Sequence, residues 1–351
     1  MHELRKDPLL GRWVIVAKNF KKALTDYIFD SSESHKRALD QISYQERCGL
    51  CSGNENETPS EIMAYRETST LPNSPGWWTR VFPNQYPVLK VEGELNRQGV
   101  GMYDKMNGIG AHEIIVESPE HNKSPEEMDI SQMERVILTY RDRISDLEKD
   151  CRLRYILIYK DHGSRFSVNG TSLHPHSQLI ATPVIPKKIK EELDGAKAYY
   201  DYKERCIFCD IMKEELKTGV RIVEERGSFV AFCPFAPLSP FEVWIMPKRH
   251  TCSFTEIVKE ETVDLAGILR SVLLRIRDVL NMPDYSYTLH TAPNRIPRGG
   301  HWHTLKDDFH WHLEILPRIT KAAGFEWGGG FYIISTPPEE AARYLRERKK
   351  G

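Results

Sequence analysis

The chain of 351 residues is long enough for two ordinary domains, or for one domain of double size, with a sizeable buried core. Its apolar content of 40% and charged content of 28% are typical of a globular protein, and no apolar run approaches membrane-spanning length. The net charge of −1 leaves no basic excess for a nucleic-acid backbone, so neither a nucleic acid nor a membrane is expected as a partner.

The first half of the chain reads as strands around one long helix. An apolar run after a glycine turn predicts a strand at 13–17, and similar runs predict strands at 113–118 and 155–159. Between the last two, residues 130–149 carry apolar side chains at helical spacing. These elements precede the most unusual stretch of the sequence.

That stretch is 173–183, with the sequence LHPHSQLIATP. In an extended strand alternate side chains share a face, which places His174, His176 and Gln178 in a row on one side. Apolar side chains on a packed strand face stabilise the fold. Two imidazoles and an amide in succession therefore indicate that this face binds something. We interpret it as a strand that presents a nucleophile to a phosphate.

The second half repeats this order after a charged connector at 187–204. A long helical pattern is followed by an expected strand at 285–291, and the segment FHWHLEILP at 309–317 parallels the row of histidines. The sequence therefore predicts two copies of one unit, residues 1–190 and 191–351, each with its own metal site and only the first catalytic.

Each copy contains a Cys-x-x-Cys pair, which needs two further ligands to close a tetrahedral site. The charged start of the chain lacks the apolar core of a secretion signal, so we expect a reducing, cytoplasmic location in which such pairs bind metal. Only some histidines occur at matched positions in both copies, and these are the predicted ligands. Two thiolates and two imidazoles favour zinc, with iron as an alternative at the second site. The predicted sets are Cys48, Cys51, His121 and His174 in the first copy, and Cys206, Cys209, His250 and His310 in the second.

The other histidines are not assigned to metal. His112 is left out because the second copy has Phe241 at what we take to be the same position. No constellation of partners is evident around four others, for which structural or loop roles are expected. These are His162, His290, His301 and His303.

His176 is the expected nucleophile because it lies two residues from an anchored ligand. Neutral imidazole attacks phosphorus well when its other nitrogen donates to a backbone carbonyl. Gln178 can donate an amide hydrogen bond to a phosphoryl oxygen, and Thr171 and Ser172 in the preceding loop offer further donors. In the second copy Glu314 takes the place of Gln178, and its carboxylate would repel a phosphate, so this copy is expected to be silent.

These features resemble those of the galactose-1-phosphate uridylyltransferases of the histidine-triad superfamily, including their branch of ADP-glucose phosphorylases. The resemblance rests on His-Pro-His-Ser-Gln at 174–178, the doubled unit, the Cys-x-x-Cys pairs, and the opening LRKDP at 4–8 with GRWVI at 11–15. It implies an α+β fold of two histidine-triad-like repeats, each an antiparallel half-barrel sheet flanked by helices, and a homodimer.

The resemblance also implies a ping-pong reaction. His176 would be nucleotidylated by a nucleotide sugar, and a sugar 1-phosphate would then accept the nucleotide. Phe82 and Asn84 match the region that holds base and ribose, whereas Phe325 and Gly330 match a sugar-phosphate region that a partner subunit completes. Asp161, also assigned to substrate binding, stands where the family usually has asparagine.

Two alternatives keep the same intermediate. Inorganic phosphate as the acceptor would make the protein a nucleotide-sugar phosphorylase, and water would make it a hydrolase. An alternative of another class is a zinc-stabilised nucleotide-binding module without catalysis, which leaves His176 and Gln178 without a role.

Overall fold

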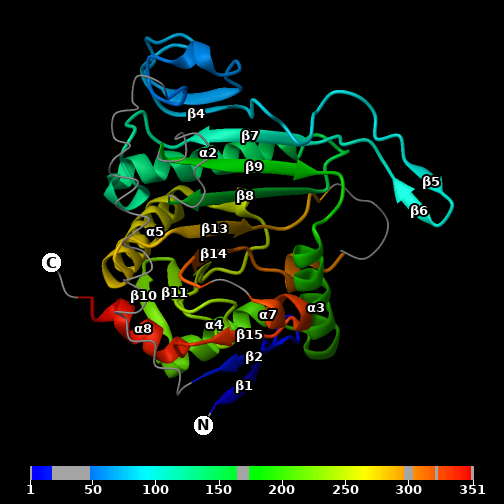
Figure 1. The fold of residues 1–351 in the computed structure, drawn as a ribbon, viewed down its shortest axis with the longest axis vertical. Coiled ribbons are helices and arrows are strands. Elements are labelled where there is room, and N and C mark those ends of the chain that lie inside the picture. Colours follow the sequence, from blue (N-terminus) through cyan, green and yellow to red (C-terminus); the bar gives the residue numbers. More distant parts are fainter. Residues whose placement is uncertain (1, 18–47, 164–173, 296–302, 321–322, 349–351) are drawn as a thin grey trace.

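The computed structural model describes residues 2–17, 48–163, 174–295, 303–320 and 323–348. Its centre is a ten-stranded antiparallel sheet to which both halves of the chain contribute (Figure 1). The first half supplies β3 (Met63–Arg66), β4 (Trp77–Pro83), β7 (Ala111–Val116), β8 (Tyr155–His162) and β9 (His176–Thr182). The second half supplies β10 (Ile222–Arg226), β11 (Phe229–Phe232), β12 (Val243–Pro247), β13 (Tyr285–His290) and β14 (His312–Pro317).

The two halves arrange their strands in the same order. From the outer edge inward the first half runs β3-β4-β7-β9-β8 and the second runs β10-β11-β12-β14-β13. At the centre β8 pairs with β13, so that Ile158 lies opposite Leu289. The α+β fold of two sheet-forming repeats flanked by helices, predicted from the sequence, is confirmed.

The strand registers identify the counterpart residues of the two repeats. Ile114 of β7 lies opposite Gln178 of β9, and Trp244 of β12 lies opposite Glu314 of β14. Gln178 and Glu314 are therefore counterparts, as are the histidines two residues before each of them.

Two long helices, α2 (Ile130–Leu147) and α5 (Lys259–Leu280), pack against each other and against one face of the sheet. α2 begins after Asp129, whose side chain accepts a hydrogen bond from the main-chain N–H of Gln132. The buried residues of both helices and of strands from both halves form one continuous core. The division of the chain at residue 190 stays a prediction.

The opposite face of the sheet differs between the halves. In the second half α3 (Lys187–Lys203) and α4 (Ile207–Thr218) cover it and form a second core with β11 and β12. The expectation of a mere connector at 187–204 was wrong, because this segment is the helix α3. Its buried residues fall on one side at helical spacing: Ile189, Glu192, Leu193 and Ala196.

In the first half the same face stays partly open. Along β9, Ser177, Leu179 and Ala181 are buried, whereas the residues that alternate with them are only partly buried. In β14 both His312 and Glu314 are buried. One repeat therefore presents its strand to solvent and the other encloses it.

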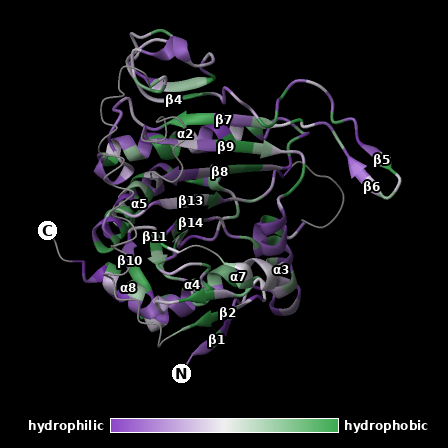
Figure 2. Ribbon diagram, in the orientation of Figure 1, coloured by the Kyte–Doolittle hydropathy of each residue, from purple (hydrophilic) through white to green (hydrophobic). Residues whose placement is uncertain are grey.

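The remaining elements lie around the sheet. Strands β1 (Glu3–Lys6) and β2 (Trp13–Val16) form a small sheet with β15 (Tyr332–Ile334), while β5 (Gln98–Val100) and β6 (Tyr103–Lys105) form a projecting hairpin (Figure 1). Hydrophobic residues concentrate in central strands such as β7, and β6 is hydrophilic (Figure 2). The shorter helices are η2 (Glu55–Glu57), η3 (Pro125–Glu127), η6 (Phe254–Glu256), α6 (Leu305–Asp308), α7 (Gly324–Gly329) and α8 (Pro338–Arg346).

Among the described residues, no helix combines the length and apolar character needed to cross a membrane.

Candidate active site and metal centres

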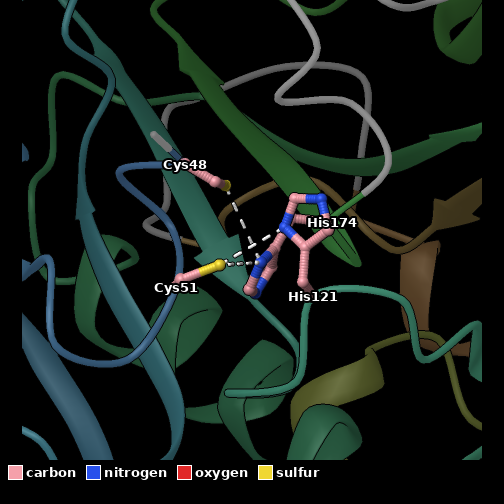
Figure 3. Close-up of side chains that lie close together, drawn as sticks. All are labelled: Cys48, Cys51, His121 and His174. Carbon is pink, nitrogen blue, oxygen red and sulfur yellow. Dashed lines mark hydrogen bonds between the residues drawn. The ribbon is translucent and has the colours of Figure 1, made fainter. Parts of the chain in front are cut away.

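Four side chains from distant segments converge just before β9 (Figure 3). Cys48 and Cys51 precede β3, His121 follows β7, and His174 lies two residues before β9. The Nδ1 atom of His174 is 3.9 Å from Cys48 Sγ and 3.6 Å from Cys51 Sγ, and Cys51 Sγ is 3.3 Å from His121 Nδ1. A tetrahedral zinc site, with Zn–S near 2.3 Å and Zn–N near 2.0–2.1 Å, has sulfur–nitrogen separations of about 3.5 Å. The donor atoms therefore fit zinc.

His174 is held in the tautomer that a ligand needs. Its Nε2–H donates to the carbonyl oxygen of Ser118 at 2.7 Å, which leaves the Nδ1 lone pair facing the sulfur atoms. Burial lowers the pKa of His174 to about 3, so the ring is neutral at physiological pH.

The second copy has the same arrangement around α4. Cys206 and Cys209 lie at the start of this helix, and the Sγ atom of Cys209 is 3.2 Å from His250 Nδ1 and 3.4 Å from His310 Nδ1. The Nε2–H of His250 donates to the carbonyl oxygen of Lys306 at 2.8 Å. Both predicted sets of four residues are therefore brought together, each with its ligand atoms within 4.8 Å of one another.

His176 is the first residue of β9 and lies on the open face. Its Nδ1–H donates to the carbonyl oxygen of His174 at 2.8 Å, so the lone pair is on Nε2. Burial, followed by the charge of Lys160, lowers the pKa of His176. A neutral imidazole with its Nε2 unprotonated can act as a nucleophile at neutral pH.

Gln178 is the next residue on the same face, and its side-chain carbonyl oxygen is held by hydrogen bonds. The Oε1 atom lies 2.9 Å from His112 Nε2 and accepts a hydrogen bond from Tyr159 Oη at 3.1 Å. An imidazole with an unprotonated Nε2 and an amide thus lie side by side on a partly exposed strand, beside a cluster suited to zinc.

Comparisons with known proteins agree with this arrangement. The family model described as the galactose-1-phosphate uridyl transferase N-terminal domain matches residues 1–186, and the model of the C-terminal domain matches residues 192–336. The protein belongs to the galactose-1-phosphate uridyl transferase family. It is an enzyme of the nucleotidyltransferase class.

Individual family members resemble the chain over nearly its whole length. An ADP-glucose phosphorylase from Arabidopsis thaliana is 33% identical over 98% of this chain and 92% of its own length. A galactose-1-phosphate uridylyltransferase from Thermotoga maritima is 30% identical over 99% and 98%. A crystal structure of an Arabidopsis thaliana ADP-glucose phosphorylase with bound ADP-glucose superposes with a TM-score of 0.81 at 31% identity, over the full length of both chains.

In this member of the family a buried polar network lies under β9. Lys160 Nζ is 2.6 Å from Glu117 Oε2 and 2.9 Å from the carbonyl oxygen of His176. Both charged side chains are 1% exposed. Burial alone would raise the pKa of Glu117, but Lys160 and the hydroxyl groups that donate to Glu117 outweigh it and lower the pKa. Those hydroxyl groups belong to Tyr140, Ser177 and Tyr287.

The second repeat has no such network at the counterpart positions. Registers place Pro247 at the position of Glu117, Leu289 at that of Lys160 and Leu313 at that of Ser177. Buried charges are costly to desolvate, and at these positions they occur under β9 but not under β14.

The predicted substrate-binding residues lie at different distances from His176. The β8·β9 register, continued by two residues, places Asp161 opposite His176, and its Oδ1 accepts a hydrogen bond from Ser286 Oγ at 2.5 Å. Asn84 Nδ2 is 3.1 Å from His112 Nε2, next to Gln178. Phe82 is 2% exposed and packs in a small cluster beside β7. Their binding roles stay predictions.

The remaining predicted binding residues are Thr171, Ser172, Phe325 and Gly330. Thr171 and Ser172 lie outside the described residues. Phe325 and Gly330 belong to α7 and its C-terminal cap, which Figure 1 shows separated from β9 by β8, β13 and β14.

A third cluster, missed by sequence reasoning, encloses the second-repeat histidine. Glu192, His290, His312 and Glu314 bring their ligand atoms within 4.8 Å of one another and could hold a metal ion. His290 Nδ1 donates to Glu192 Oε2 at 2.8 Å. The expectation that His290 has no constellation was wrong, because it lies opposite His312 in the β13·β14 pairing.

His112 was also missed, because the repeat was aligned one residue out of register. The strand pairing makes Glu242, and not Phe241, the counterpart of His112. The available signal was strand alternation, since His112 precedes Ile114 by two residues and so shares the face of Gln178.

Replacing Lys160 by methionine should strongly destabilise the protein. The Glu117 carboxylate would stay buried without its cation, and breaking such a pair costs about 3–5 kcal/mol in the free energy of unfolding. Combining Lys160→Met with Glu117→Gln should recover part of this loss, because the buried charge is then gone. Chemical denaturation of the three variants measures both effects.

The exposed pair of Lys149 and Asp146 provides the control. Lys149→Met should change the free energy of unfolding by less than about 1 kcal/mol, as is usual for surface pairs. Equal effects of Lys160→Met and Lys149→Met would contradict a structural role of the buried pair.

Proposed function

We propose that this enzyme transfers a nucleoside monophosphate from a nucleotide sugar to a sugar 1-phosphate through a covalent nucleotidyl intermediate on His176. The observation that carries the proposal is the hydrogen bond from His176 Nδ1 to the His174 carbonyl oxygen, which leaves Nε2 unprotonated on the open face of β9. Gln178 lies next to it on that face.

The first step forms one bond and breaks one. His176 Nε2 attacks the α-phosphorus of the nucleotide sugar, and the electron pair of the P–O bond that breaks leaves with the sugar 1-phosphate. The imidazole becomes positively charged, and the His174 carbonyl oxygen that accepts from Nδ1 stabilises this charge. The Gln178 amide can donate to a phosphoryl oxygen without adding negative charge.

The second step reverses the first with a new acceptor. A phosphate oxygen of the incoming sugar 1-phosphate attacks the same phosphorus, the P–N bond breaks, and its electron pair returns to Nε2. No general base is needed, since the attacking oxygen is already anionic. We therefore assign the catalytic roles to His176 and Gln178.

We further propose zinc at both Cys₂His₂ clusters, with iron as the alternative at the second. Four protein ligands fill each tetrahedral site, so the metal would act structurally by fixing loops to β9 and β14. The thiolates must remain reduced for this purpose, which favours a cytoplasmic location.

A homodimer is part of the proposal. Phe325 and Gly330 lie far from His176 of the same chain, and Phe325 is 55% exposed. A second copy would have to supply these residues if they bind the sugar phosphate.

The second candidate is a nucleotide-sugar phosphorylase, in which inorganic phosphate takes the place of the sugar 1-phosphate. It is supported by the 33% identity to an ADP-glucose phosphorylase and by the similar fold of such an enzyme that binds ADP-glucose. The intermediate on His176 is the same in both reactions.

Incubation with UDP-glucose, UDP-galactose or ADP-glucose should add the mass of a nucleoside monophosphate to the intact protein. His176→Ala should abolish this adduct because the nucleophile is removed. His312→Asn, at the counterpart position in the second repeat, should still form it. Intact-protein mass spectrometry measures the adduct and shows which base is accepted. The absence of an adduct with every nucleotide sugar would favour the non-catalytic binding module.

Addition of an acceptor to the isolated adduct identifies the reaction. With an adduct formed from UDP-glucose or ADP-glucose, galactose 1-phosphate should yield the corresponding galactose nucleotide if the enzyme is a transferase, whereas glucose 1-phosphate only reverses the first step and would do so in a phosphorylase as well. Release of a nucleoside diphosphate by inorganic phosphate would make it a phosphorylase, and release of a nucleoside monophosphate in buffer alone would make it a hydrolase.

Metal analysis should find about two zinc ions per chain, one for each Cys₂His₂ set. Cys51→Ser and Cys209→Ser should each lose one equivalent, since a hydroxyl is a poor substitute for a thiolate ligand. Elemental analysis measures zinc and iron together and so also tests the alternative metal.

Cys151→Ser is the matched control, because Cys151 is exposed and belongs to neither cluster. It should keep both metal ions. Unchanged metal content in both Cys51→Ser and Cys209→Ser would contradict the ligand assignment.

A further inference from the structure

His112 lies on β7 with its ring between the main chain of Val88 and the side chain of Gln178. The main-chain N–H of Val88 is 3.3 Å from His112 Nδ1. A backbone N–H can only donate, so Nδ1 must accept, and the ring proton is therefore on Nε2. The Nε2–H then donates to Gln178 Oε1 at 2.9 Å.

Gln178 Oε1 receives a second hydrogen bond from Tyr159 Oη at 3.1 Å. Two donors occupy the two lone pairs of this oxygen. A 180° rotation of the amide would turn its NH₂ group toward the ring N–H of His112, so the observed orientation is strongly favoured. The NH₂ group is consequently the end of Gln178 that remains for a ligand.

Asn84 does not compete for the proton of His112. Its Nδ2 lies 3.1 Å from Nε2, and its Oδ1 accepts from the N–H of Tyr86 at 2.9 Å. Because the Nε2–H is directed to Gln178, Asn84 Nδ2 finds no acceptor there, and its hydrogens are left for another partner.

We propose that His112 is a positioning residue that fixes the amide of Gln178 with its NH₂ group toward the transferred phosphoryl group. The inference rests on the proposed function, in which Gln178 donates to a phosphoryl oxygen. His112 itself does not touch the reacting atoms, and it acts through Gln178.

The second repeat supports this assignment. The counterparts of His112, Tyr159 and Gln178 are Glu242, Thr288 and Glu314. Burial, and then the nearby Glu314, raises the pKa of Glu242 to about 7. In the second repeat, where β14 is buried, other residues thus replace the Gln178 amide and both of its donors, His112 and Tyr159.

The test compares two amide variants of similar size. In His112→Gln the new amide can reach the position of the ring Nε2 and donate to Gln178, whereas in His112→Asn the shorter amide replaces only Nδ1. His112→Asn should slow formation of the nucleotidyl-His176 adduct by about 10- to 100-fold, because a single donor to a developing oxyanion is worth about 100- to 1000-fold and only its orientation is lost. His112→Gln should recover most of the rate, and KM should change little in both.

The decisive measurement repeats the substitution in a Gln178→Ala background. If His112 acts through Gln178, His112→Asn should cause no further loss there, so the two effects are strongly non-additive. Tyr159→Phe, which removes the other donor to Oε1, should behave in the same way with a smaller effect. Thermal unfolding of each variant checks that the fold is retained.

Three outcomes would overturn the inference. The first is a wild-type rate in folded His112→Asn, and the second is a multiplicative loss in the Gln178→Ala background. In the third, His112→Gln and His112→Asn would be impaired equally, which indicates a merely structural role. A wild-type protein that forms no adduct would instead refute the proposed function, and the inference with it.

Discussion

The chemistry proposed for this enzyme depends on one short hydrogen bond, from His176 Nδ1 to the carbonyl oxygen of His174. It fixes the tautomer of the nucleophile, and it holds only if both ends of a three-residue segment are immobile. His174 is anchored in the first Cys₂His₂ cluster, and the carbonyl oxygen of His176 accepts from Lys160. The cysteine pair and the buried lysine are remote in sequence, yet both restrain the same few atoms.

The cost of this restraint explains why it occurs once. A buried lysine and glutamate must be desolvated, and apolar residues of similar volume are often as stable or more stable. The second repeat has proline and leucine at the counterpart positions. Since the two repeats share strand order, registers and the geometry of their Cys/His clusters, the fold itself does not require the polar network under β9.

The sequence was sufficient to predict the repeat, the inner strands β7, β8, β9, β13 and β14 of the central sheet, and the two sets of cysteines and histidines that lie together, because each rests on spacing that occurs twice. It was not sufficient for His112, Glu192 or Lys160. Their partners lie on other strands or helices, and a one-residue error in register moves a side chain to the other face. The helix α3 was also missed, since its charged residues concealed four buried positions.

The second repeat is expected to lack catalytic activity, but for a different reason from the one inferred from the sequence. The sequence argument invoked repulsion between a phosphate and the carboxylate of Glu314. In the structure Lys188 Nζ lies 2.5 Å from Glu314 Oε2, so this negative charge is largely compensated. Enclosure is the stronger effect, because His312 is fully buried beneath the face that α3 and α4 cover, and no phosphate can approach its Nε2. The partial exposure of β9, and the burial of β14, is therefore decided by where the helices pack on a sheet whose two halves have the same strand order.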